Sequence, residues 1–403
     1  MQRSVHLDPD NPGEVVRDGQ LVQYLRSETQ RLAGRVEGYS RFPGSQPVSL
    51  LQGHLNTLRQ HRFLVCEKSD GVRYLFLILK VNFVVRNPPR CWQTHLEGRT
   101  GACYFINRKF EFLAVPSLDV QLGPGCIDAL DHTLLDGELV SDRVFRSPDD
   151  SLEQAEQLPK QSTFLVFDSL SVRNQYVGNL DLFDRLRVAQ GEVIFTIRAM
   201  HPEPPQDVPC VITLKQMYAK EDVGFVLRRI LPRALPHEND GLIFTRYDKP
   251  YKIGTCEDIL KWKPRHLNSI DFECRARWAV NDEGQQEPRY CDILVAVRGT
   301  PQHHGFMYFS EEQQDMLRER YQNRSIIVEC VLEDDWPRVE PPPQHGRWAD
   351  MRKLPGPGWR FHRVREDKKI ANDIKTYQRT LESINAGINE DTLIDLLSLR
   401  NGP

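Results

Sequence analysis

The sequence has no long apolar run. None of its stretches approaches eighteen apolar residues, and Met1 to His6 lack the apolar segment of a secretion signal. These absences exclude a helical membrane span and predict a protein that stays inside the cell.

Cysteine patterns are missing as well. The nine cysteines are scattered, with no Cys-x-x-Cys pair and no nearby His-x-x-x-His. The spacing therefore indicates neither a disulfide framework nor a zinc site. We expect these cysteines to be small buried apolar residues.

The chain also lacks an excess of positive charge. Its 53 Lys and Arg residues face 56 Asp and Glu residues, for a formal net charge of -3. This balance excludes a protein that coats nucleic acid by global attraction, so any polynucleotide contact must be local. With 39% hydrophobic and 27% charged residues, the 403-residue chain has the composition of a globular protein. Its length predicts two domains.

The most informative segment that is present is Lys68-Ser69-Asp70-Gly71-Val72-Arg73. It lies between two runs of β-forming residues, and Asp-Gly in that setting predicts a hairpin with Lys68 at the end of one strand and Arg73 at the start of the next. Two interpretations fit the segment alone. Lys68 is the nucleophile of a covalent nucleotide site, or it is a solvated lysine on an exposed turn.

Carboxylates recur beside apolar strands. Asp136 and Glu138 are two apart in an apolar segment, so a regular strand would turn both to the same side. The segment His237 to Phe244 again places acidic residues directly before a short apolar strand. A strand end followed by a solvated turn remains the alternative for each.

Two basic segments follow. In Lys261-Trp262-Lys263, period-two spacing places both ammonium groups on one face of a strand, which a bound polyphosphate would favour. Trp359 to Lys369 alternates basic residues in the same way. Surface solvation explains either segment equally well in isolation.

The pattern of apolar and turn residues changes after Pro264. Before it, strand-like and helix-like segments alternate, which indicates an α+β fold. After it, short apolar runs separated by turn residues are typical of a small β-barrel. From Lys369 onward the apolar spacing predicts a helical tail with a break near Gly387.

Taken in order, these segments resemble the motifs of the covalent nucleotidyltransferases, which include the eukaryotic messenger-RNA capping guanylyltransferases and the ATP-dependent DNA and RNA ligases. The resemblance covers nearly the whole chain. The matching segments are Lys68 to Arg73, Asp136 to Glu138, Phe164 to Asp168, Asp240 to Ile243, Lys261 to Lys263 and Arg365 to Lys368.

The last of these segments, Arg365-Glu366-Asp367-Lys368, looks like the motif that distinguishes capping enzymes from DNA ligases. Arg41 to Ser49 also resembles a capping-enzyme stretch. The chain is therefore identified as similar to the single-function alpha subunit of fungal capping enzymes. It departs from the pattern at Asn107, where members often carry Asp before the Arg.

The resemblance implies a fold. It predicts an α+β nucleotidyltransferase domain of antiparallel sheets with flanking helices over residues 1–265, and a C-terminal OB-fold β-barrel over residues 266–369. A helical tail over residues 370–403 packs back on the first domain or extends from it.

The resemblance also implies a role for each matching residue. Lys68 is the nucleophile. The residues implied in nucleotide binding are Arg73 and Glu138 for the ribose, Phe167 and Ile243 for the purine, Lys261 and Lys263 for the α-phosphate, Arg365 and Lys368 for the β- and γ-phosphates, and Arg108 and Asp367 beside them. Mg²⁺ or Mn²⁺ is the implied cofactor, with Asp240 and Glu138 as candidate ligands.

The implied reaction transfers GMP from GTP, through a lysyl-GMP intermediate, to the 5′-diphosphate end of nascent RNA in the nucleus. The implied partners are a separate RNA triphosphatase and the phosphorylated tail of RNA polymerase II, and no membrane. Two alternatives stay open. An ATP-dependent polynucleotide ligase would form lysyl-AMP instead, and an inactive scaffold of the same fold would form no adduct.

Overall fold

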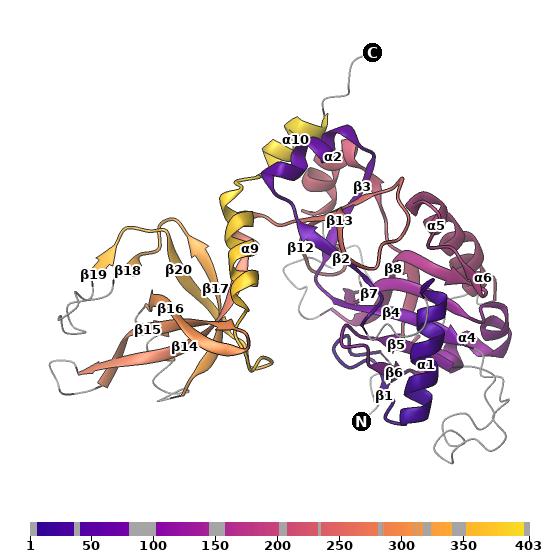
Figure 1. Ribbon diagram of the computed structural model, residues 1–403, viewed down its shortest axis with the longest axis horizontal. Helices are drawn as coiled ribbons and strands as arrows, with labels where there is room; N and C mark the ends of the chain where they lie inside the picture. The colour runs from indigo at the N-terminus through magenta and orange to yellow at the C-terminus, as the bar shows by residue number, and fades with distance from the viewer. Residues whose placement is uncertain are drawn as a thin grey trace. The chain divides into compact units, whose positions relative to one another are not determined.

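The computed structural model describes most of the chain as two compact units (Figure 1). Unit 1 comprises Met1–Val48, Leu55–Trp262 and Leu393–Pro403, and unit 2 comprises Ser49–His54 and Lys263–Thr392. The described residues are 6–35, 41–79, 102–144, 158–200, 208–232, 235–280, 284, 286–310, 312–313, 315–316, 324–340 and 352–398.

Unit 1 contains two β-sheets. The larger has eight strands and is antiparallel except where β10 runs parallel to β8. In spatial order its strands are β1 (Glu14–Val15), β6 (Phe112–Ala114), β5 (Ala102–Ile106), β4 (Val72–Leu79), β7 (Thr133–Arg143), β8 (Lys160–Val172) and β10 (Val211–Leu214), with β9 (Gln175–Tyr176) also paired to β8.

The smaller sheet of unit 1 has five strands. Their spatial order is β11 (Tyr218–Ala219), β3 (Phe63–Ser69), β12 (Asn239–Arg246), β13 (Gly254–Trp262) and β2 (Ser45–Ser49). The flanking helices of the unit are α1 (Gly19–Leu32), α2 (Leu55–Gln60), α4 (Pro116–Ala129), α5 (Leu182–Val188), η3 (Ala189–Ile194), α6 (Phe195–Met200), η4 (Lys220–Asp222), α7 (Val223–Phe225) and η5 (Val226–Ile230).

Strand β4 is buried on both faces, which explains the uninterrupted apolar run from Tyr74 to Leu79 that follows its one charged residue, Arg73. Phe76 and Ile78 belong to a core cluster that also holds Leu118 of α4. The alternate residues Leu75 and Leu77 belong to a second cluster. Since successive side chains of a strand point to opposite faces, a strand covered on both sides needs apolar residues at every position.

The hairpin predicted at Lys68 is wrong, although the strand boundaries nearly match. β3 lies in the smaller sheet and β4 in the larger one, so Asp70-Gly71 carries the chain from one sheet to the other. The backbone N–H of Asp70 donates to Glu238 O at 2.8 Å. A local turn signal specifies a change of direction, but the strand partners are chosen by the core.

Unit 2 is a five-stranded barrel of OB type. Its sheet order is β16 (Thr300–Tyr308), β15 (Gln286–Val297), β14 (Ser269–Val280), β17 (Ile326–Glu333) and β20 (Gly358–Val364), all paired antiparallel. The outer strands β16 and β20 also contact each other. This Greek-key order is that of the OB fold.

Smaller elements complete unit 2. They are η1 (Gln52–His54), η6 (Arg265–Leu267), the ribbon of β18 (Arg338–Glu340) and β19 (Arg352–Leu354), and helix α9 (Ile374–Asn385). Helix α10 (Glu390–Ser398) follows, and its residues from Leu393 onward belong to unit 1. The predicted break in the tail is confirmed at Gly387, which has a φ of +63°.

The expectation that the cysteines are unpaired is wrong for two of them. Cys274 of β14 and Cys291 of β15 are joined by a disulfide, with their Cα atoms 5.8 Å apart. The strand register makes them diagonal neighbours, which their separation in sequence does not reveal. The other six described cysteines are free and buried. Among the described residues, no helix has the length and apolar character that a membrane crossing requires.

The crossing between the two sheets gives a stability prediction. A Cβ at Gly71 would lie 2.6 Å from the backbone oxygen of Leu139. We expect Gly71→Ala to lower the free energy of unfolding by about 1–3 kcal/mol, because backbone must shift to admit the methyl group. Gly191→Ala is the control, since nothing lies within 4 Å of its Cβ position. Equal urea midpoints for the two variants would contradict this prediction.

Candidate active site

A pocket in unit 1 is lined by residues of both sheets. Six residues that the sequence predicts for the site line it: Lys68, Arg73, Arg108, Glu138, Phe167 and Ile243. The smaller sheet contributes Lys68 and Ile243, and the larger sheet contributes Arg73, Glu138 and Phe167. These six residues therefore meet in one cavity, although they lie far apart in the sequence.

Lys68 forms an ion pair with Asp240. The distance from Lys68 Nζ to Asp240 Oδ1 is 2.7 Å, and the two side chains are 26% and 20% exposed. Their strands β3 and β12 are antiparallel neighbours, with an irregularity between Asn239 and Leu242. The carboxylate therefore holds the ammonium group at the pocket wall, where a ligand can reach it.

Arg73 is fixed by a buried bidentate pair. Its Nε and Nη2 atoms donate to the two carboxylate oxygens of Asp136 at 2.9 and 2.5 Å. Its Nη1 donates to Ser45 O, and the hydroxyl of Tyr251 donates to Asp136 at 2.5 Å. The same guanidinium lies over the ring of Phe167. The distance from Arg73 Cζ to the ring centroid is 5.3 Å, which is within the range of cation–π attraction.

Glu138 lies opposite Arg73 in the pairing of β7 with β4. Burial raises the pKa of its carboxyl, and the charges of Lys215, Arg108, Arg73 and Lys68 oppose that rise. The expectation that Asp136 and Glu138 turn to the same side is met, because both line the pocket. Glu138 is thus a carboxyl group set among four cations.

The sequence interpretation missed a buried charge cluster behind Lys68. Lys215 Nζ lies 3.0 Å from Glu67 Oε1, and both residues line the pocket. His237 Nε2 is 3.4 Å from the same oxygen, and His237 Nδ1 is 2.8 Å from Asp142 Oδ1. Ser69 completes the cluster. The available signal was Glu67, a carboxylate inside an apolar run.

The Lys261-Trp262-Lys263 motif only partly meets the prediction. Trp262 is buried and Lys261 lies on the same strand face as the pocket residue Ile243, its partner across the β12–β13 ladder. Neither Lys261 nor Lys263 lines the pocket itself. Lys263 directly follows β13 and belongs to unit 2 by its contacts.

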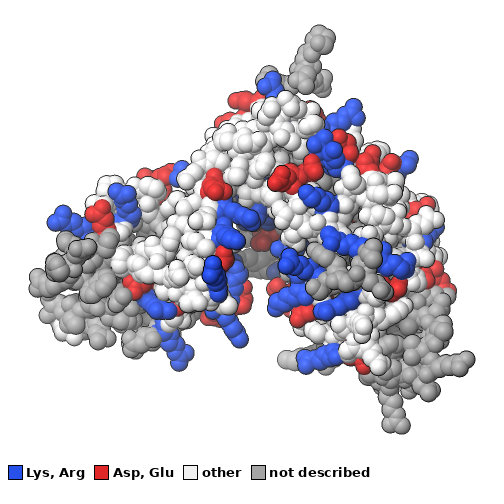
Figure 2. All heavy atoms as spheres, viewed as in Figure 1, with Lys and Arg blue, Asp and Glu red and all other residues white. Residues whose placement is uncertain are grey.

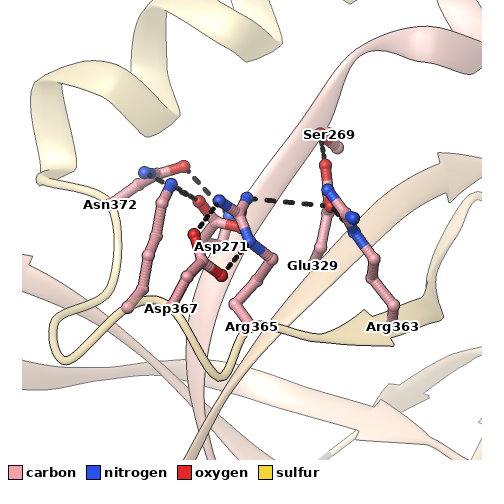
Figure 3. Close-up of polar contacts among 8 residues, drawn as sticks. Ser269, Asp271, Glu329, Arg363, Arg365, Asp367 and Asn372 are labelled. Atoms are coloured by element: carbon pink, nitrogen blue, oxygen red, sulfur yellow. Dashed lines mark hydrogen bonds and ion pairs between the residues drawn. The ribbon is translucent and has the colours of Figure 1, made fainter. Parts of the chain in front are cut away.

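The remaining predicted residues form an ion cluster in unit 2, shown in Figure 3. Asp271 of β14 is buried and binds both Arg365, at 3.2 Å, and Lys368. Arg365 also pairs with the exposed Asp367 at 2.7 Å and lies 3.8 Å from Glu329. Hydrogen bonding to Asp367 raises the pKa of Arg365 and lowers that of Asp367 to about 2. One buried carboxylate thus brings the two predicted phosphate-binding cations together.

The described residues contain no group of three or more His, Cys, Asp or Glu side chains that could hold a metal ion. Such a cage is not needed for Mg²⁺, which proteins usually hold through one or two carboxylates together with substrate phosphates. Asp240, which is ion-paired with the pocket residue Lys68, fits that mode. Glu138 fits it less well, because four cations already surround it.

Comparison with known proteins identifies the family. The model of the mRNA capping enzyme catalytic domain matches residues 12–265, and that of the mRNA capping enzyme C-terminal domain matches residues 267–394. This chain belongs to the mRNA capping enzyme family. Both matches are to capping enzyme domains, which agrees with the capping-type resemblance of Arg365 to Lys368.

Relatives within the family extend over most of the chain. It is 30% identical to the mRNA-capping enzyme subunit alpha of Schizosaccharomyces pombe over 383 residues, covering 93% of this chain and 83% of the relative. It is 30% identical to the same subunit of Yarrowia lipolytica, covering 96% and 89%. Identity to the mRNA-capping enzyme of Caenorhabditis elegans is 26%, covering 89% and 49%.

Among solved structures, an ATP-dependent DNA ligase from bacteriophage T7 in complex with ATP is similar at a TM-score of 0.34 and 13% identity, covering 78% of this chain and 98% of the ligase.

The face of the molecule shown in Figure 2 does not carry charges of one sign only. Lys and Arg side chains are interspersed with Asp and Glu side chains on the face in Figure 2. This mixture agrees with the net charge of -3 and with recognition of an anionic substrate by local groups.

The buried histidine gives a pH prediction. Burial alone would lower the pKa of His237, but its bonds to Asp142 and Glu67 raise it above the ordinary value of 6.5. Its stabilising effect is therefore full below pH 6.5 and is lost as pH rises through the raised pKa. Glu67, with a pKa of about 2, stays ionised throughout.

We expect the difference in Tm between wild type and His237→Asn to be largest near pH 6 and to shrink toward about pH 8.5, measured by thermal unfolding across that range. A difference that stays constant with pH would contradict the assignment.

Proposed function

We propose that the chain is an mRNA guanylyltransferase in which Lys68 carries GMP. The amine attacks the α-phosphorus of GTP, a nitrogen–phosphorus bond forms, the bond to the bridging oxygen breaks, and pyrophosphate leaves. The 5′-diphosphate end of an RNA then displaces Lys68 and takes GMP in a 5′–5′ linkage. The observation that carries the proposal is the position of Lys68, which is paired with Asp240, in the wall of a pocket that Arg73, Glu138 and Phe167 also line.

The attack requires a neutral amine, and an ordinary lysine is protonated at neutral pH. Asp240 is the nearest carboxylate to Lys68, so it is placed to accept the proton or pass it to water. Arg73 and Glu138 bind the ribose in this proposal. Phe167 and Ile243 pack on the purine.

Phosphate binding completes the assignment of roles. Lys261 and Lys263 hold the α-phosphate, Arg108 assists at the pocket, and Arg365, Asp367 and Lys368 serve the β- and γ-phosphates. A bound Mg²⁺ or Mn²⁺ would neutralise phosphate charge and orient the leaving pyrophosphate. Asp240 is its proposed ligand, with Glu138 as the second candidate.

The proposed setting is the nucleus, where messenger RNA is processed. The relatives are named as alpha subunits, which supports a separate partner that supplies the 5′-diphosphate end. We assign that role to an RNA triphosphatase and recruitment to the phosphorylated tail of RNA polymerase II.

The decisive test uses α-labelled GTP or ATP with a divalent metal, followed by a denaturing gel. We expect label from GTP on the wild-type protein and none on Lys68→Ala, because only the amine can form the covalent bond. Lys109→Ala, an exposed lysine outside the pocket, is the control and should keep its label. Label from ATP alone would indicate a ligase, and no label from either would indicate a scaffold.

A second test separates the two half-reactions. The β- and γ-phosphates are present in GTP but absent from lysyl-GMP. Arg365→Ala or Lys368→Ala should therefore slow adduct formation by about tenfold or more, while transfer of GMP already attached changes much less. Arg363→Ala, which removes a neighbouring cation paired with Glu329, is the matched control. Equal losses in both steps would count against these roles.

A further inference from the structure

The charge cluster behind Lys68 has no part in the proposed covalent chemistry. It consists of Glu67, Ser69, Asp142, Lys215 and His237, of which all but Asp142 are at most 7% exposed. Glu67 and Ser69 are the chain neighbours of Lys68. The members come from both sheets, since β3 belongs to the smaller sheet and Asp142 lies on β7 of the larger one.

Lys215 is the member that faces the nucleotide. It directly follows β10, its backbone N–H donates to Val166 O at 2.7 Å, and its side chain lines the pocket. Its ammonium group lies 2.5 Å from Ser69 Oγ and 3.0 Å from Glu67 Oε1. An ammonium has three donors, so one donor remains for an oxygen acceptor on a bound molecule.

Glu67 compensates the charge of that ammonium. A buried lysine without a partner favours its neutral form. Burial would raise the pKa of Glu67, but its bond to His237 and the charge of Lys215 lower it to about 2. The carboxylate is therefore ionised and compensates Lys215 at all ordinary pH values.

His237 in turn holds Glu67. Its Nε2 faces Glu67 and Ser69, at 3.4 and 3.1 Å, and its Nδ1 lies 2.8 Å from Asp142. With both ring nitrogens protonated, the imidazolium joins two carboxylates from different sheets. The cations Lys215 and His237 and the anions Glu67 and Asp142 then form a cluster with no net charge. The ammonium of Lys215 is the group of this cluster that is placed to bind a ligand in the pocket.

We propose that Glu67 and His237 are positioning residues that hold Lys215 as a fixed, charged donor in the wall of the nucleotide pocket. The inference rests on the proposed function in taking the ligand to be a nucleotide. It adds that the residue before the nucleophile acts through Lys215 and not on Lys68. Without Glu67, the ammonium would lose its position and the affinity for GTP would fall.

The test is a double-mutant cycle on the full chain, with Glu67→Gln, Lys215→Met and the double variant. Dissociation constants for GTP are measured by calorimetry without divalent metal, so that chemistry does not interfere. Each single variant should weaken GTP binding by about tenfold or more, the loss typical of one charge-assisted hydrogen bond. The double variant should bind about as weakly as Lys215→Met alone, because Glu67 then has nothing left to position.

Multiplicative losses in the cycle would overturn the inference, since they mean that Glu67 acts without Lys215. Unchanged binding by Glu67→Gln would also overturn it. Asp119→Asn, a buried carboxylate of the same unit that does not line the pocket, is the control and should bind GTP normally. If Glu67→Gln does not fold, Ser69→Ala replaces it in the cycle with a smaller expected loss.

The calorimetric cycle and the labelling assay together distinguish failure of one proposal from failure of the other. A wild-type protein that binds GTP but forms no labelled adduct would contradict the guanylyltransferase reaction, while the cycle would still decide the role of Glu67. A labelled adduct together with multiplicative losses would leave the reaction standing and remove the positioning role.

Discussion

The geometry of the pocket depends on the buried pair of Arg73 and Asp136. These residues lie on the adjacent strands β4 and β7 of the larger sheet. Arg73 also donates to the backbone oxygen of Ser45 in β2, and Asp136 accepts from the hydroxyl of Tyr251, which lies between β12 and β13; all three of these strands belong to the smaller sheet. Removing one partner of such a pair leaves a buried charge uncompensated, which costs about 3–5 kcal/mol. The interaction that shapes the nucleotide site therefore also joins the two layers that form its walls.

Four of the predicted cations already have a carboxylate partner. Lys68 is paired with Asp240, Arg73 with Asp136, Arg365 with Asp367 and Asp271, and Lys368 with Asp271. A nucleotide must therefore exchange with carboxylates at the exposed pairs, whereas the buried pairs stay in place. The exposed Asp367 and the buried Asp271 show both situations on one arginine. In this arrangement the buried carboxylates fix the positions of the cations, and the exposed carboxylates occupy the positions that phosphate groups would take.

Sequence alone was sufficient for the motifs and insufficient for their connections. Six of the predicted site residues, from Lys68 to Ile243, line one pocket, and the tail breaks at Gly387 as its glycine indicates. The hairpin failed because a turn signal does not choose strand partners. The Lys215 cluster was missed because its members are 146 to 168 residues apart in pairs such as Ser69 with Lys215 or His237. Cross-strand contacts of that kind leave no local pattern.

The two-residue crossing at Asp70-Gly71 has a consequence for the motif that contains it. Lys68 is the last residue but one of β3, and Arg73 is the second residue of β4, in a different sheet. The number of residues between Lys68 and Arg73 therefore sets the distance that the chain covers when it passes from one sheet to the other. An inserted residue would keep every functional group and still shift Lys68 relative to Arg73 on the opposite wall of the pocket. The motif therefore specifies the number of residues between Lys68 and Arg73 as well as their side chains.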